Sequence, residues 1–164
     1  MTSWAPYYCT ALCKHASVLN LPVGQIEGWY WRSPYQLVWI HFRSQQPPGS
    51  SGEDASYWVW LHTNSTWLNG QFPGETPAIV SNFNYIMPNS TWRLIKVSWW
   101  VGLDIYCATS LQVKLEVWED GAWQDKGSAY DPANLAANTG LARCGITFSR
   151  DPCYADDTII RGPA

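Results

Sequence analysis

Charged side chains are scarce in this chain of 164 residues. Asp, Glu, Lys and Arg make up 14% of it, against roughly a quarter in typical soluble domains. The ten Lys and Arg residues are scattered, no two of them are adjacent, and the net charge is −3. Because binding to a phosphate backbone requires a basic patch, the sequence argues against a nucleic-acid partner.

Long apolar runs and a secretory signal are also lacking. The longest apolar stretch, residues 94–111, is interrupted by polar residues such as Lys96 and Asp104, which excludes a spanning helix. We therefore expect no membrane insertion. Residues 1–6 lack the basic and apolar regions of a signal peptide. This predicts a protein made in a host cytoplasm that leaves the cell within a virion; an extracellular protein is the alternative.

Sequence motifs for catalysis and metal binding are missing as well. There is no Gly-x-Ser-x-Gly, no phosphate-binding Gly loop and no His-Glu-x-x-His. Cys9, Cys13 and His15 do not follow a standard zinc spacing, and the acidic residues of the C-terminal part form no calcium loop. The sequence predicts no enzymatic activity, no cofactor and no metal.

The cysteine count is odd, so at least one thiol has no intrachain disulfide partner. Cys144 and Cys153 flank a short segment and are candidates for a bridge. The alternative is that all the cysteines are reduced and partly buried, since a free Cys behaves as a small hydrophobe. The pairing stays open for the whole set, which is Cys9, Cys13, Cys107, Cys144 and Cys153.

Aromatic residues are abundant, with twelve Trp and nine Tyr. A monomer that exposed all of them would be poorly soluble. We therefore expect a homo-oligomer, attachment to a larger protein assembly, or a broad aromatic binding patch.

Two segments, residues 38–41 and 59–62, repeat one pattern: Val-Trp-Ile-His and Val-Trp-Leu-His. With the period of two that a β-strand imposes, each has an apolar core face and an aromatic face with polar tips. The second face, here called the Trp/His face, consists of Trp39, His41, Arg43, Trp58, Trp60 and His62. It is interpreted either as a glycan-stacking platform or as buried packing and subunit interface. Trp100 and Trp118 pose the same question on other strands.

Alternation and turn signals predict strands with long loops between them. The expected strands are 29–31, 36–43, 57–63, 78–80, 92–105, 111–118 and 145–149. The inward set of the two long strands is Ile95, Val97, Trp99, Val101, Leu103, Leu111, Val113, Leu115 and Val117. Asp120-Gly121 predicts a type I′ hairpin turn. Residues 10–19 predict a short helix and 64–89 an irregular stretch.

These patterns favour an all-β fold, an antiparallel β-sandwich of jelly-roll type with long loops. The expected organisation is an irregular or short-helical N-terminal arm (1–27), a sandwich domain (28–150) and an irregular C-terminal tail (151–164).

The segment 92–123 resembles jelly-roll β-sandwich modules. The residues that carry the likeness are the alternating run 111–118 and the Asp120-Gly121-Ala122-Trp123 turn. Such modules recur in carbohydrate-binding proteins and in phage tail or capsid proteins. The resemblance implies a virion or extracellular binding role without catalytic residues.

Two functional hypotheses follow. The first is a non-enzymatic structural protein of a virus or phage particle (capsid decoration, tail or fibre subunit), in which Trp-rich faces seal subunit contacts. The alternative is a lectin-like carbohydrate-binding module, in which the Trp rings of the Trp/His face stack on a glycan and its His and Arg side chains form a polar rim.

Overall fold

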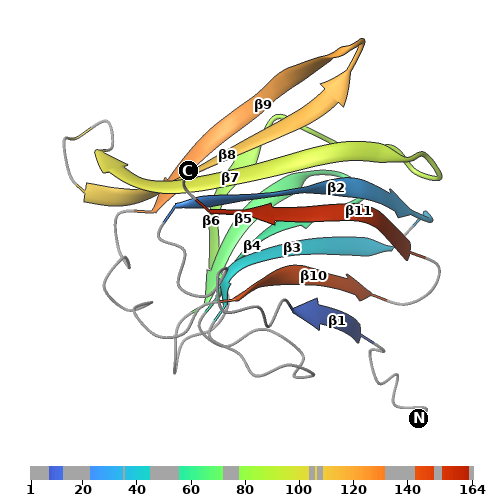
Figure 1. The fold of residues 1–164 in the computed structure, drawn as a ribbon, viewed down its shortest axis with the longest axis horizontal. Coiled ribbons are helices and arrows are strands. Elements are labelled where there is room, and N and C mark those ends of the chain that lie inside the picture. The colour runs from blue at the N-terminus through green and yellow to red at the C-terminus, as the bar shows by residue number, and fades with distance from the viewer. Residues whose placement is uncertain are drawn as a thin grey trace.

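The protein is a sandwich of two antiparallel β-sheets (Figure 1). The computed structural model describes residues 8–12, 23–34, 36–44, 56–71, 78–103, 106, 109–131, 143–149 and 153–162. Every pairing between the described strands is antiparallel. The predicted fold class is therefore confirmed.

The first sheet has six strands. Their spatial order is β1 (Tyr8–Leu12), β10 (Arg143–Ser149), β3 (Leu37–Ser44), β4 (Ser56–Leu61), β5 (Thr66–Gln71) and β6 (Ala78–Phe83). The second sheet has five, in the order β11 (Cys153–Arg161), β2 (Gly24–Arg32), β7 (Arg93–Leu103), β8 (Thr109–Glu119) and β9 (Ala122–Asp131). In the described part of the chain, no helix has the length and apolar character needed to cross a bilayer.

The core lies between the sheets and is built by the predicted alternation. Residues Val38, Ile40, Phe42, Tyr57, Val59 and Leu61 from the six-stranded sheet are fully buried, as are Leu111, Val113, Leu115 and Val117 from β8. Burying one large apolar side chain contributes about 1.5–3 kcal/mol. The two facing sets therefore supply the main force that holds the sheets together.

Trp99 is the largest fully buried side chain of the core. Its ring stacks on that of Phe42 in the opposite sheet, with ring centroids 5.1 Å apart. On its own sheet, Trp99 lies opposite Gly24, and a Cβ atom at Gly24 would come within 2.6 Å of the indole ring. The indole thus requires a residue without a side chain on β2.

The hairpin turn between β8 and β9 is confirmed. Asp120 and Gly121 both have positive φ, 52° and 79°, as a type I′ turn requires. The turn brings Trp118 opposite Trp123, with ring centroids 5.5 Å apart.

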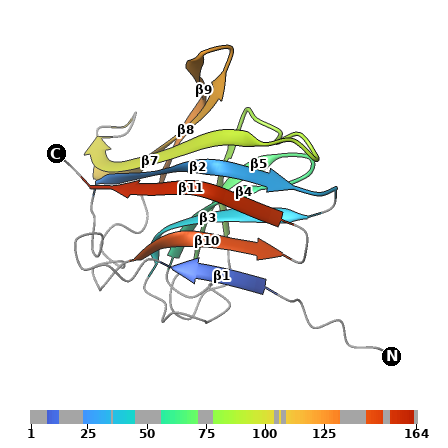
Figure 2. The ribbon, with the colours of Figure 1, turned by 45° about the vertical axis from the view of Figure 1, so that its right-hand side comes forward.

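Three sequence-based expectations about strands are wrong. Residues 64–89 contain β5 and a β6 longer than predicted, and the tail contains β11, which pairs with β2. Residues 10–12, expected in a helix, belong to β1, which pairs with β10 at the sheet edge (Figure 2); the remainder of that helix lies outside the described residues. Backbone pairing with a neighbouring strand stabilises these segments, and their own sequences alternate weakly.

The inward set of β7 is confirmed only in part. Ile95, Val97 and Trp99 are fully buried, whereas Val101 and Leu103 are exposed. By the alternation of the strand, Val101 and Leu103 lie on the same face of β7 as Ile95, Val97 and Trp99. The pairing of β7 with β2 ends at Trp99 and Gly24, so Val101 and Leu103 have a partner strand only on the β8 side.

We expect Gly24→Ala to destabilise the fold by about 1–3 kcal/mol, because the new methyl group would overlap the Trp99 ring. Urea unfolding measures this change. In a Trp99→Leu background the same substitution should cost clearly less, since the group it collides with is gone. Equal costs in the two backgrounds would contradict the contact.

Candidate ligand-binding faces

The structure places the Trp/His face on the outer side of the six-stranded sheet. Trp39 lies opposite Trp60, and Trp60 lies opposite Trp67 on β5. The ring centroids of these pairs are 6.1 Å and 4.9 Å apart. In the next row His41 lies opposite Trp58, with a separation of 5.9 Å. The Trp and His residues predicted on β3 and β4 are therefore brought together as one aromatic surface.

Sequence reasoning missed the part of this surface that β5 contributes. Trp67 and Asn69 continue the two rows across the sheet, but their segment was interpreted as irregular. The alternation of Trp67, Leu68 and Asn69, with Leu68 fully buried, is the signal that could have identified the strand.

Most of the Trp/His face is buried. Trp39, His41 and Trp58 are each less than a tenth exposed, although they point away from the core. Arg43 is equally buried but does not continue this face, because its φ of 51° interrupts the alternation of β3 and its guanidinium interacts electrostatically with the core residue Tyr57. The half-buried members are Trp60 and His62, beside the half-buried Trp67. This burial agrees with the packing interpretation for Trp39, His41 and Trp58; whether they seal a subunit interface stays a prediction.

His62 forms the corner of this face. Its ring stacks on Trp67 at 5.3 Å and meets Trp60 edge-on at 5.4 Å. Its Nδ1 accepts a hydrogen bond of 3.3 Å from the backbone N–H of Asn64. Partial burial, together with the positive charge of Arg32, lowers the pKa of His62.

His41 is buried without a polar partner. Only 3% of the residue is exposed, and neither ring nitrogen has a hydrogen-bond partner among the described residues. Burial disfavours the charged imidazolium and lowers the pKa of His41 to about 4. The ring is therefore neutral at pH 7.

A metal site built on His41 and His62 finds no support in this geometry. Across the residues that the structure describes, no group of three or more His, Cys, Asp or Glu side chains converges. Two histidines without a third ligand make a weak site.

The suggested disulfide is wrong: Cys144 and Cys153 are both buried and are not bonded to each other. Cys153 Sγ instead lies 3.9 Å from the carbonyl oxygen of Leu37, to which it donates a weak hydrogen bond. The other three cysteines are not among the residues whose side chains are described.

A second aromatic surface lies on the outer side of the five-stranded sheet. We call it the aromatic band; it consists of Trp29, Trp31, Trp92, Trp118, Trp123 and Tyr154. Unlike the Trp/His face it is open: Trp29, Trp92, Trp118 and Tyr154 are 37%, 43%, 40% and 52% exposed. Of its members, sequence analysis singled out only Trp118 as a candidate. Trp100, the other candidate outside the Trp/His face, is half-buried farther along β7.

Cross-strand pairing assembles the band. Tyr154 on β11 lies opposite Trp31 on β2, with ring centroids 5.2 Å apart, and Trp92 lies 6.5 Å from Tyr154. Trp29 is paired with Leu94. Since Ile95 is paired with Val117, Leu94 and Trp118 share the outer face at the same level, which connects Trp29 to the hairpin.

The segment that carries Trp92 is anchored by a buried arginine. The Arg32 guanidinium, which is 1% exposed, donates to the carbonyl oxygen of Met87. The backbone carbonyl of Arg32 accepts a hydrogen bond of 2.8 Å from Ser90 N. These bonds hold the chain that leads into β7 and so place Trp92 beside Tyr154.

A row of ion pairs borders the band. Lys96 and Glu116 are 2.8 Å apart, Lys114 contacts both Glu116 (3.1 Å) and Asp125 (3.5 Å), and Arg161 and Glu27 are 3.0 Å apart. Partial burial opposes ionisation of Glu116, but hydrogen bonds from Lys96 and Lys114 outweigh it and lower the pKa of this carboxyl.

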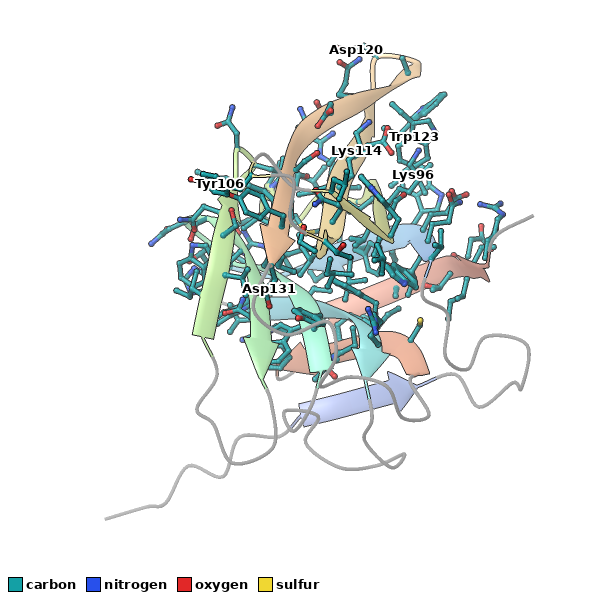
Figure 3. The ribbon with its side chains drawn as sticks, turned by 90° about the vertical axis from the view of Figure 1, so that its left-hand side faces the viewer. Lys96, Tyr106, Lys114, Asp120, Trp123 and Asp131 are labelled. Atoms are coloured by element: carbon teal, nitrogen blue, oxygen red, sulfur yellow. The ribbon has the colours of Figure 1, made fainter. Side chains whose placement is uncertain are left out.

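Lys96 joins this charged row to the aromatic band. Its Nζ lies 4.2 Å from the ring centroid of Trp123, within the range of a cation–π interaction. Lys96, Lys114 and Trp123 gather beside the β8–β9 hairpin (Figure 3).

Comparison with known proteins identifies the architecture. No family model and no curated protein matches the chain. Among solved structures, carbohydrate binding module CBM66 from Bacillus subtilis superposes with a TM-score of 0.59, covering 94% of this chain and 95% of that one. The chain has the fold of a carbohydrate-binding module. The identity is 8%, so the likeness shows the fold alone. It confirms the resemblance to carbohydrate-binding β-sandwich modules and leaves the likeness to virion proteins a prediction.

Acidification should destabilise the protein through His41. Below pH 6.5 the unfolded chain takes up a proton at His41, which the folded chain does not accept until about pH 4. The stabilising contribution is therefore complete above pH 6.5, is lost as the pH falls through this window, and totals on the order of 3 kcal/mol.

Urea unfolding of the wild type and His41→Gln at pH 7 and at about pH 5 measures this effect. We expect the wild type to lose more stability than the variant on acidification. Both chains keep His62, so its titration cancels in the comparison. Equal losses would show that His41 is not buried in the neutral form.

Proposed function

We propose that the chain is a non-catalytic carbohydrate-binding domain whose ligand surface is the aromatic band. The observation that carries this proposal is that the solvent-exposed rings of the aromatic band lie next to one another on the outer side of the five-stranded sheet. Pyranose rings present C–H faces that stack on Trp and Tyr, while side-chain dipoles and charges nearby hydrogen-bond their hydroxyls. The carbohydrate-binding-module fold supports the same proposal.

Exposure favours the band over the Trp/His face as the ligand site. A sugar reaches a ring only where the ring meets solvent, and four members of the band are more than a third exposed. On the Trp/His face, Trp39 and Trp58 are closed off, which leaves Trp60, His62 and Trp67 as its accessible corner. We therefore propose that the glycan platform is the aromatic band of the five-stranded sheet and not the Trp/His face.

A non-catalytic role is in keeping with the chemistry of the described residues. Glu27, Glu116 and Asp125 beside the band are engaged with Lys or Arg, and the buried His41 has no acid or base within hydrogen-bond reach among the described residues. A glycoside hydrolase needs two carboxyl groups flanking the bond that is cleaved.

Substituting a ring of the band should weaken glycan binding. We expect Trp29→Ala and Trp118→Ala each to raise the Kd at least tenfold, a loss of about 1.4 kcal/mol or more, because each removes an aromatic anchor of the surface. Affinity electrophoresis against soluble β-glucan, α-glucan, mannan and xylan identifies a ligand, and titration calorimetry then gives the Kd. Trp29→Phe should retain part of the affinity because it keeps a stacking ring.

Trp60→Ala serves as the matched control, since it removes an indole from the outer face of the other sheet. It should leave the Kd unchanged while circular dichroism confirms that all the variants are folded. Loss of binding in Trp60→Ala, with normal binding in Trp29→Ala and Trp118→Ala, would assign the site to the Trp/His face.

A second candidate function is that of a structural subunit in a virion or another assembly. The observation that favours it is the exposure of large apolar side chains outside the band: Ile79, Ile86, Val101, Leu103 and Tyr106. Apolar side chains of this size are typical of surfaces that associate with other proteins. On this proposal the chain is a homo-oligomer or is attached to a particle, and Trp-rich faces seal the contacts.

Light scattering over a range of protein concentrations tests this candidate. A structural subunit should give a defined oligomer whose mass falls in Leu103→Lys, because a charge would be buried in the contact. A monomer at every concentration would contradict self-assembly and leave the glycan-binding proposal in place.

A further inference from the structure

We infer that the aromatic band selects an uncharged, extended polysaccharide that crosses the strands of the five-stranded sheet. This inference rests on the proposed glycan-binding function and specifies its ligand class. Two features carry it: the direction in which the rings follow one another, and the carboxylate partner that each described cation of this face already has.

The rings of the band follow one another across the sheet. Tyr154 lies on β11, Trp29 on β2, Trp118 on β8 and Trp123 on β9, and Leu94 fills the position between them on β7. With neighbouring strands roughly 4.8 Å apart, five strands span about 19 Å. A ligand parallel to the strands would meet the rings of one or two strands only. A ligand that uses the whole band must cross them, and it must contain several sugar units.

Among the residues that the structure describes, this face has no cation left over for an acidic ligand. Among the described residues of the outer face, Lys96, Lys114 and Arg161 each have a carboxylate partner. Their carboxylates belong to Glu27, Glu116 and Asp125. A uronate or sulfate group could bind a lysine or arginine here only by displacing such a partner, which would itself be left uncompensated.

The surplus charge of the face is negative. Asp156 lies opposite Trp29 and is exposed. In the described part of this face it adds a fourth carboxylate beside three cations. Repulsion between like charges therefore works against an anionic chain. Sugar hydroxyls carry no charge and can donate hydrogen bonds to carboxylate oxygens that remain in their ion pairs.

Lys96 is further restricted by its second contact. Its ammonium group lies between Glu116 and the ring of Trp123. Moving it toward a ligand anion would cost both interactions, so the lysine nearest the rings acts as a fixed support for Trp123.

The test compares each neutral polysaccharide that the full chain binds with its own carboxymethyl derivative, so that backbone and linkage stay constant. We expect the neutral polymer to bind at least about tenfold more tightly. Its Kd should not change when NaCl is raised from about 0.05 M to 0.5 M, because no ion pair forms with the ligand.

Asp156→Lys supplies the matched variant. Asp156 is exposed, and replacing it leaves an unpaired cation beside Trp29. The variant should improve binding of the carboxymethyl derivative several-fold, in a manner that salt abolishes, and leave the Kd of the neutral polymer within about twofold.

Ligand length tests the direction of binding. Across a series of neutral oligosaccharides the affinity should rise with length until the chain spans the band. For the longest members only, Trp29→Ala and Trp123→Ala should both lower affinity. A short oligomer that binds as tightly as the polymer, and is sensitive to one of the two substitutions, would overturn the crossing direction.

The possible failures are distinguishable. If no polysaccharide, neutral or acidic, is retained, the proposed function itself fails. If the carboxymethyl derivative binds more tightly than its neutral parent and salt weakens it, glycan binding stands and the inference of an uncharged ligand is overturned.

Discussion

The fold depends above all on the burial of two apolar sheet faces against each other, with the Trp99 indole at their centre. This ring touches Phe42 across the sandwich and Gly24 within its own sheet, so it sets the spacing of the sheets and the close approach of β2 to β7. Burial of apolar area of this kind is the dominant favourable term in folding. Because the inward faces must meet, every residue of opposite parity on the same strands points outward. The placement of the remaining Trp residues follows from that constraint.

The aromatic side chains of the two outer faces differ in their exposure to solvent. On the six-stranded sheet, Trp39, Trp58 and His41 are closed off, and His41 is left with ring nitrogens that no described residue satisfies. A buried polar group without a partner costs free energy, and the same burial disfavours the charged imidazolium and so lowers the pKa of His41. On the five-stranded sheet, the rings stay open to solvent beside paired charges. An open aromatic surface is costly for solubility, and a ligand that covers it removes that cost.

The ion pairs beside the band link stability to recognition. Surface pairs contribute little individually, about 0–1 kcal/mol, so Lys96, Glu116 and Lys114 are of minor importance for folding. In the proposed function they have a second effect, because they hold hydrogen-bonding oxygens in place and leave no cation unpaired among the described residues of the face. On that proposal the same contacts shape which glycan the surface accepts.

What the sequence alone determined is local. Strict alternation at 111–118, and in the two repeated Val-Trp segments, was sufficient to predict strands, their inward residues and the sandwich class, because side chains of a strand alternate whatever it pairs with. The Asp120-Gly121 turn was equally predictable, since only a few residue types tolerate its dihedral angles. The strands β5 and β11 were missed: β5 alternates clearly only over Trp67, Leu68 and Asn69 and is stabilised by pairing with β4 and β6, whereas β11 is stabilised by pairing with the distant β2. Nor could the sequence show which outward Trp side chain is buried and which is exposed. That depends on what packs over each face and on the order of the strands. Both are decided only in the tertiary structure, because they require segments far apart in the chain to come together.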